Sequence, residues 1–188
     1  MKTEESSTIA KLSSKSKEHY TPKFLVDKAR KVLSTIDLDP ATSKRVNSLY
    51  IKATNFYTKE DDALTKEWKE NVFLNPPGGR ILDGVSRPKS SAKEFYTKLL
   101  KEFRNGNVRS AILVVYSLDQ LAQNQELLNY TFCILKQRLR FLYETSYGNF
   151  EEGSSQSHSN AIVLLTRDER VKNKFIEEFS ELGKVLNG

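Results

Sequence analysis

The chain has 188 residues, 38% of them hydrophobic, which suits one folded domain and excludes a chain that is disordered throughout. Its 30 basic and 24 acidic residues give a net charge of +6, which favours a polyanionic partner such as nucleic acid but is also common in lysine-rich proteins. A single cysteine excludes an internal disulfide and a cysteine-cluster metal site, and no apolar run approaches the roughly 18 residues that cross a bilayer.

The chain is expected to begin with a disordered tail. Residues 1–18 are rich in Ser, Lys and Glu and poor in apolar residues, so we predict a tail without fixed structure and a single domain over residues 19–188. Thr21 is suited to cap the first helix and Pro22 to open it, and the apolar side chains that follow share one helical face as far as Leu33.

Short apolar strands and helices then alternate along the chain. Strands are expected at 36–39, 72–74, 109–116, 132–135, 139–143 and 161–165. Helices are expected at 43–49, 92–104, 118–128 and 168–182, and loops at 75–79, 79–91 and 146–159. This alternation, with a hairpin-like pair of strands near the end, predicts an α/β domain with a mostly parallel sheet of about six or seven strands and an antiparallel edge near the C-terminus.

The sharpest local feature is the tripeptide Asn75-Pro76-Pro77, directly after an expected buried strand. Ligands of open α/β sheets lie at the carboxyl ends of the strands. A rigid turn at this point would hold an amide side chain and a backbone carbonyl as two acceptors for a planar amine. An ordinary proline-stiffened turn is the alternative interpretation of the tripeptide alone.

Two acidic stretches are further candidates. Asp37-Leu38-Asp39-Pro40-Ala41 ends the first expected strand, where carboxylates can bind ribose hydroxyls or an ammonium group. Asp61 and Asp62 lie in a second acidic segment. Considered in isolation, the first stretch is explained at least as well by a solvated turn, and the second is explained better by a solvated helix start.

The combination of motifs is more specific than any one of them. It resembles the phage-type DNA adenine methyltransferase family, found in phage and prophage genomes, in the order His19-Tyr20-Thr21-Pro22, Asp37 to Ala41, Phe56 to Leu64 with Trp68, and Val72 to Pro77. The resemblance is dense from His19 to Gly79 and looser as far as Leu165, and the order of its motifs is similar to the gamma arrangement of amino-methyltransferases. It implies a Rossmann-like class I methyltransferase fold and S-adenosylmethionine-dependent methylation of an exocyclic base amine in DNA, most simply that of adenine, without a metal.

The resemblance also implies residue roles. The catalytic residues it implies are Asn75, Pro76 and Pro77. The cofactor-binding residues it implies are Tyr20, Thr21, Pro22, Asp37, Asp39, Pro40, Ala41, Asp61 and Asp62. The cofactor is S-adenosylmethionine.

Two departures from the family pattern matter for the chemistry. The catalytic loop usually carries an aromatic residue after its second proline, where it stacks on the flipped base, but Gly78 occupies that position here. Phe73, Tyr96 or a residue of the following loop are candidates for its replacement. There is also no glycine before Gly78, so the usual glycine-rich cofactor loop is missing and the Asp39-Pro40-Ala41 segment takes its place.

The second half of the chain supplies candidate DNA contacts. Cys133, Arg138, Arg140, Phe141 and the segment Ser157 to Asn160 resemble a subset of the family with Asn-Pro-Pro-Gly-Gly loops. The partner implied is duplex DNA with the target base flipped out. The candidate DNA-binding residues are Arg80, Arg87, Lys89, Lys136, Arg138, Arg140, His158 and Asn160.

Alternatives exist for these basic and polar residues. Lys136, Arg138 and Arg140 alternate along an expected strand, which suits phosphate contact or a solvated edge strand. His158 and Asn160 suit either a base contact or a polar turn.

Other functions also fit the sequence. A catalytically degenerate methyltransferase fold that binds DNA or protein is one, and amino-methylation of another base or of RNA is another. The expected location is the cytoplasm of a bacterial host cell, with no membrane partner. The sequence leaves the oligomeric state and the recognised DNA sequence open.

Overall fold

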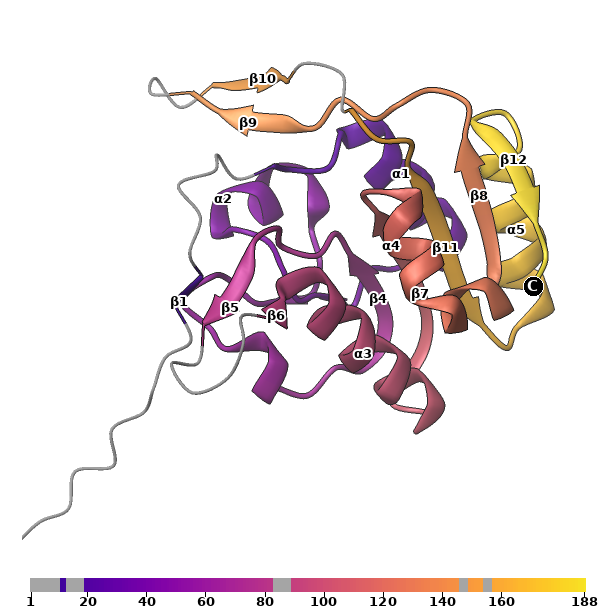
Figure 1. Cartoon of the computed structure of the whole chain (residues 1–188), viewed down its shortest axis with the longest axis horizontal. Helices are drawn as coiled ribbons and strands as arrows, with labels where there is room; N and C mark the ends of the chain where they lie inside the picture. The colour runs from indigo at the N-terminus through magenta and orange to yellow at the C-terminus, as the bar shows by residue number, and fades with distance from the viewer. Residues whose placement is uncertain (1–10, 13–18, 83–88, 146–148, 154–156) are drawn as a thin grey trace, which may run out of the picture.

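The structure is a computed structural model that describes residues 11–12, 19–82, 89–145, 149–153 and 157–188. Its centre is a seven-stranded sheet of order β12-β8-β11-β7-β4-β2-β3 (Figure 1). In that order the strands are Gly183–Leu186, Thr131–Leu135, Ala161–Thr166, Val108–Val115, Glu70–Leu74, Leu38–Asp39 and Asn55–Phe56.

The sheet is parallel in its first half and antiparallel toward the C-terminus. β3, β2, β4 and β7 pair in parallel, whereas β11 runs antiparallel to both β7 and β8, and β12 runs antiparallel to β8. Five of the seven strands therefore point the same way. The α/β fold class with an antiparallel edge near the C-terminus is confirmed.

Helices cover both faces of the sheet because successive side chains of each strand point to opposite sides. On β7, Ile112 and Val114 pack against α1 (Lys23–Leu33) and α5 (Glu169–Phe179), while Leu113 and Val115 belong to the core beneath α3 (Ser91–Arg104). Figure 1 shows α3 in front of the sheet and α5 behind it.

The first helix starts close to the expected position but is capped differently. Pro22 occupies the N-cap of α1, and no side chain caps that end, so the prediction that Thr21 caps the helix was wrong. Thr21 is instead buried, and its backbone carbonyl accepts a hydrogen bond from the Tyr50 hydroxyl at 3.1 Å. α5 has the cap that its sequence suggests, since Asp168 accepts from the Arg170 N–H at 2.8 Å.

Two expected helices are interrupted. The helix predicted over 43–49 is α2 (Lys44–Val46), which continues as the π-helical turn Asn47–Ile51. The helix predicted over 118–128 is α4 (Leu118–Gln123), followed by the 3-10 turn Gln125–Asn129. A 3-10 turn, Ala63–Thr65, also precedes β4.

The segment after the proline turn is not the unstructured loop that we predicted over 79–91. Its ends form β5 (Arg80–Leu82) and β6 (Lys89–Ser90), which pair antiparallel, and β1 (Lys11–Leu12) pairs with the other side of β5. The expected tail thus contains a short strand. The remaining tail residues lie outside the described ones, and the division into a tail and a single domain stays a prediction.

The hairpin predicted from 132–135 and 139–143 was also wrong. β8 pairs with β11 and β12, whereas β9 (Leu142–Glu144) pairs with β10 (Phe150–Glu152), inside the segment expected to be a loop. The cause is a change of direction after Leu135, where the Leu139 N–H turns to the Asn160 side chain. The β9–β10 hairpin lies along the top of the molecule in Figure 1.

Candidate active site

Three neighbouring parallel strands end side by side and direct polar or aromatic side chains to one face. Phe73 and Val114 pack on the α1 face of the sheet, so the alternation of side chains carries Asn75 and Tyr116 to that face as β4 and β7 end. Asp39 ends β2 on the same face, because its neighbour Leu38 belongs to the opposite core. The sheet thus brings together two residues predicted from sequence and one that was not.

The Tyr20-Thr21-Pro22 segment lies beside this edge. Tyr20 pairs with Leu142 of β9 through two backbone hydrogen bonds, of 2.7 and 2.8 Å, and its ring contacts the Phe150 ring at 5.6 Å. Tyr50, which is carried by the π-helical turn, binds the Thr21 carbonyl. The predicted cofactor segment is therefore held between the β9–β10 hairpin and that turn.

Asp39 is a buried carboxyl group with little local compensation. Its side chain accepts one hydrogen bond, from the Ala41 N–H at 3.0 Å, and the residue is 2% exposed. Burial raises the pKa of Asp39 to about 7, against the smaller opposite effect of that hydrogen bond. The pKa of Tyr50 is also raised, first by burial and then by the nearby Tyr20 and Asp39, so these three groups share one environment.

Two hydroxyl groups near the edge are buried without a partner. Among the described side chains, Thr42 Oγ1 and Ser91 Oγ are the buried polar atoms that lack a hydrogen bond. Thr42 follows the Asp39-Pro40-Ala41 segment, and Ser91 donates its backbone N–H to the Gly79 carbonyl at 3.2 Å. A buried hydroxyl group without a partner is a group that a polar ligand could satisfy.

The Asn75-Pro76-Pro77 loop joins the cofactor segment directly. The half-buried Asn75 side chain donates from Nδ2 to the His19 carbonyl at 3.3 Å, which leaves Oδ1 as its acceptor. Gly79 has a φ of 83°, the left-handed region that glycine adopts without strain, and the loop ends there. The loop geometry is thus fixed at both ends.

The other acidic candidates are separated from Asp39. Asp37 accepts from the Asn71 N–H at 3.1 Å and lies 4.0 Å from the Arg109 guanidinium, at the amino ends of β4 and β7. Asp61 is exposed, and the N–H and hydroxyl of Thr58 bind its carboxylate, both at 2.9 Å, which lowers its pKa. Asp62 is exposed in the same turn. These contacts match the turn interpretation better than a cofactor role.

The residues suggested as replacements for the missing loop ring are inaccessible. Phe73 is 0% exposed and Tyr96 is 1% exposed, with the Tyr96 hydroxyl bound to Gln120 Oε1 at 3.0 Å. Both are core residues, so neither can stack on a base in this structure.

Several residues of the site were not predicted from the sequence. Tyr50, Thr42 and Tyr116 reach the edge only through folding, and no motif marks them. For Tyr116 the available signal was its position after the most apolar strand of the chain, at a strand end where ligands bind.

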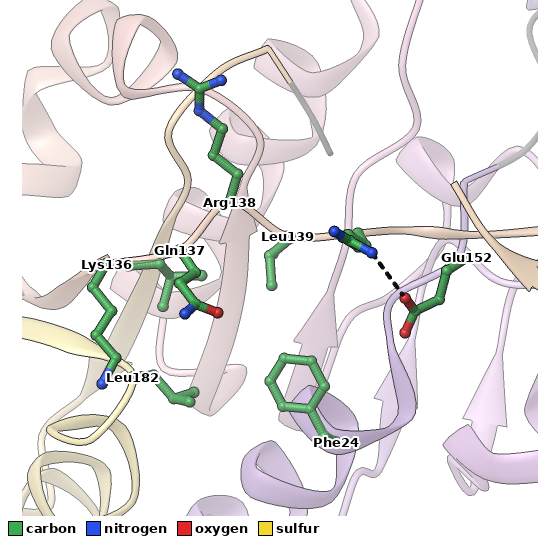
Figure 2. A pocket seen from close by; sticks show the side chains of 9 residues that line it. Phe24, Lys136, Gln137, Arg138, Leu139, Glu152 and Leu182 are labelled. Atoms are coloured by element: carbon green, nitrogen blue, oxygen red, sulfur yellow. Dashed lines mark ion pairs between the residues drawn. The ribbon is translucent and has the colours of Figure 1, made fainter. Parts of the chain in front are cut away.

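The predicted basic strand is instead a loop. Residues 136–140 connect β8 to β9 without strand structure, and Lys136, Arg138 and Arg140 are exposed there. They border a cavity of about 200 Å³ whose apolar lining includes Phe24, Leu139 and Leu182. In Figure 2 the Lys136 and Arg138 side chains point away from one another, and Arg140 forms an ion pair with Glu152 at 3.8 Å.

The remaining DNA-binding candidates fall into different environments. Arg80 and Lys89 are exposed on β5 and β6, and Arg87 lies outside the described residues. His158 is exposed, with its ring 5.7 Å from the Tyr116 ring. Asn160 is 0% exposed and uses both side-chain atoms internally, with Leu139 N and Tyr116 O, so the prediction of a DNA contact for Asn160 was wrong.

Two features absent from the described residues bear on other kinds of function. They contain no group of three or more His, Cys, Asp or Glu side chains arranged to hold a metal ion. None of their helices has the length and apolar character needed to cross a membrane.

Comparison with known proteins gave one match. A family model described as DNA N-6-adenine-methyltransferase (Dam) matches residues 10–176. The comparisons with curated proteins and with solved structures gave no match. The matched span includes Asp39, Asn75, Tyr116 and the β9–β10 hairpin.

Proposed function

The chain belongs to the DNA N-6-adenine-methyltransferase family, and from this premise we propose that it methylates the N6 amine of adenine in duplex DNA with S-adenosylmethionine as methyl donor. The observation that carries the proposal is the hydrogen bond from Asn75 to His19, because it joins the candidate catalytic loop to the candidate cofactor segment. Asp39 lies at the end of the neighbouring strand, on the same face.

The cofactor site that we propose consists of the Tyr20-Thr21-Pro22 segment, Asp39 with Pro40 and Ala41, Thr42 and Tyr50. The buried Asp39 carboxyl group suits a ligand with an ammonium group or hydroxyls, since such a partner would stabilise its charged form. Thr42 Oγ1 is a buried hydroxyl that a polar ligand can satisfy. When bound, S-adenosylmethionine supplies a methyl group on a sulfonium sulfur, which a nitrogen lone pair can attack.

Asn75 and Pro76 orient the target amine. The Asn75 Nδ2 group is bound to His19, so its Oδ1 accepts one amine hydrogen, and the Pro76 carbonyl accepts the other. Two acceptors hold the nitrogen with its lone pair turned away from conjugation with the ring. They also stabilise the positive charge that develops on the nitrogen as it is methylated, so they act mainly in the transition state.

DNA contacts are proposed on two sides of this loop. Arg80 and Lys89 belong to the strands that follow it, and Lys136, Arg138 and Arg140 belong to the β8–β9 loop. His158 precedes β11, which lies between β8 and β7 in the central sheet. Cations at such positions bind phosphates without reading sequence. The target base must leave the duplex to reach Asn75, since the amine is inaccessible within the stack.

The test is identification of the product. Unmethylated duplex DNA and, in a parallel reaction, RNA are incubated with the protein and isotopically labelled S-adenosylmethionine, digested, and analysed by mass spectrometry of the nucleosides, and DNA binding is measured separately. N6-methyldeoxyadenosine is expected from the wild type and not from Asn75→Ala. Labelled N4-methyldeoxycytidine would show that the target base is cytosine and not adenine. Label in RNA alone would show that the substrate is RNA. DNA binding without any methylation would identify a catalytically degenerate binding module.

A further inference from the structure

The backbone of the loop that contains Asn75, Pro76 and Pro77 does not explain why glycine, and not an aromatic residue, occupies position 78. Gly78 is exposed, its φ is not in the left-handed region, and a Cβ atom built there meets nothing within 4 Å. A larger side chain therefore fits, and the fold does not require glycine. A flipped base still needs an apolar surface beside Asn75, which must come from elsewhere in the chain.

Aromatic side chains gather near the end of β7, the next strand of the sheet. Tyr116 directly follows β7 and is half-buried. Its ring lies 6.1 Å from the Phe141 ring and 5.7 Å from the exposed His158 ring, with interplanar angles of 31° and 58°. Phe141 is buried, whereas Tyr116 keeps part of its surface exposed and His158 is exposed.

The group is connected to the catalytic loop. The His19 carbonyl binds Asn75, and the His19 ring lies 6.3 Å from the Phe141 ring, which contacts Tyr116. β4 and β7 are adjacent, and Asn75 and Tyr116 project to the same face as their strands end. The Tyr116 ring thus lies at the end of the strand next to the one that carries Asn75, on the face to which Asn75 projects.

Buried hydrogen bonds fix the position of Tyr116. Asn160 Nδ2 donates to the Tyr116 carbonyl at 2.6 Å, and Asn160 Oδ1 accepts from the Leu139 N–H at 2.8 Å. The Leu118 N–H donates to the Ser159 carbonyl at 3.1 Å, so the segments that carry Tyr116 and His158 are tied together on both sides. These hydrogen bonds fix the backbone that carries the Tyr116 ring, and a fixed backbone preorganises the ring for stacking.

We propose that Tyr116 provides the surface on which the flipped base stacks, with His158 bordering the same pocket, in place of the ring that the catalytic loop lacks. This inference rests on the proposed function, since it concerns the base that Asn75 orients. Stacking on an aromatic side chain depends on the ring and not on the hydroxyl, and it tolerates different bases. Removal of the ring should therefore weaken productive DNA binding without affecting the cofactor.

The experiment compares Tyr116→Leu with Tyr116→Phe. Tyr116→Leu should lower kcat/KM for DNA methylation by roughly 5- to 150-fold, the equivalent of one lost stacking contact, while the Kd for S-adenosylmethionine and the Tm stay close to wild type. Tyr116→Phe keeps the ring and should stay within about twofold of wild type. Adding Gly78→Phe to Tyr116→Leu should restore part of the lost kcat/KM, because it supplies a ring from the loop.

The outcomes separate the two proposals. Wild-type kcat/KM in Tyr116→Leu, an equal defect in Tyr116→Phe, or a loss confined to cofactor affinity and Tm would each overturn the stacking role while methylation by the wild type stood. Failure of Gly78→Phe to restore activity would show that the two positions do not serve one pocket and would also overturn it. A wild type that produces no methylated base would instead overturn the proposed function, and the stacking role with it.

Discussion

Asp39 Oδ1 accepts a hydrogen bond from the Ala41 N–H at 3.0 Å, and among the described residues this is the one contact that opposes the effect of burial on that carboxyl group's pKa. The result is a pKa of about 7 for Asp39, so the group changes charge near neutral pH. Ligand binding and folding should both respond to that change, in opposite directions.

Cofactor affinity should rise with pH. The charged form of Asp39 is the one that attracts an ammonium group, and its fraction increases as pH passes through about 7. If the charged form binds, calorimetric titration of S-adenosylmethionine should show an affinity roughly 25-fold higher at pH 7.5 than at pH 5.5. Asp39→Asn should bind weakly at both pH values, and a wild type without this pH dependence would contradict a role for the Asp39 charge.

Stability should follow the opposite trend. The pKa of Asp39 lies above the 3.8 of an unperturbed carboxyl, so the folded state is favoured by protonation, and this contribution is lost as pH rises through about 7. Asp39→Asn keeps an acceptor for Ala41 but cannot ionise. Urea unfolding should therefore show the variant to be more stable than wild type at pH 8 and similar to it at pH 4. Equal stability of Asp39→Asn and wild type at pH 8 would mean that burial does not penalise the charged form of Asp39.

Asn75→Ala should lower turnover by orders of magnitude while leaving the cofactor bound. Loss of one acceptor for the developing charge typically costs about 10²–10³-fold in kcat. Asn75→Asp should retain more activity than Asn75→Ala, because it keeps an acceptor and adds complementary charge, although it loses the donor to His19. The measurements are single-turnover methylation rates and cofactor Kd, and full activity of Asn75→Ala would show the loop to be structural.

Tyr50→Phe should affect the cofactor segment. The variant removes the donor to the Thr21 carbonyl, a bond of 3.1 Å beside a buried residue, and such a loss costs about 0.5–1.5 kcal/mol in stability. We expect a lower Tm together with a several-fold weaker Kd for S-adenosylmethionine. Tyr57→Phe is a matched control, because the Tyr57 hydroxyl binds the Glu67 carbonyl at 3.0 Å and not the Thr21 segment. An equal loss of affinity for S-adenosylmethionine in Tyr50→Phe and Tyr57→Phe would contradict a specific role for the Tyr50 hydroxyl.

The β8–β9 loop should govern the salt dependence of DNA binding. Lys136→Ala with Arg138→Ala should weaken binding to any duplex and reduce the slope of log K against log salt by up to about 2, if each cation neutralises one phosphate. Lys101→Ala is the control, since Lys101 is exposed in the last turn of α3, at the amino-end edge of the sheet. Equal effects of the loop and control variants would indicate general charge attraction in place of a binding surface.

The elements that could be predicted are those whose own residues determine them. α1, α3 and α5 show one apolar face, and the apolar run of β7 marks a central strand. β3 and β1 have two residues each, and their pairing partners are distant in sequence, so nothing local identifies them. The β9–β10 hairpin was missed because Phe150 and its neighbours are half-exposed and lack the alternation of a buried strand.

The residues of the candidate site could be predicted where they lie within a sequence motif. Asn75 and Asp39 stand at strand ends in recognisable sequence contexts, and the fold brings them to one face. Asp37 is two residues from Asp39, yet its carboxylate turns toward Asn71 at the amino end of β4. The hydrogen bond from the Asn71 N–H sets that direction. Tyr50 and Tyr116 required the tertiary structure, since a π-helical turn positions one and the path of the sheet positions the other.

The position of β11 has a consequence for the order in which the chain can fold. β11 lies between β7 and β8 in the sheet but follows both in sequence, so the edges of β7 and β8 that pair with β11 stay open until residues 161–166 have been synthesised. During translation the eight-residue apolar strand β7 keeps one hydrogen-bonding edge open, and such edges promote aggregation. A chain that stops before Ala161 should therefore accumulate in inclusion bodies or require a chaperone, even though it contains Asp39, Asn75 and Tyr116.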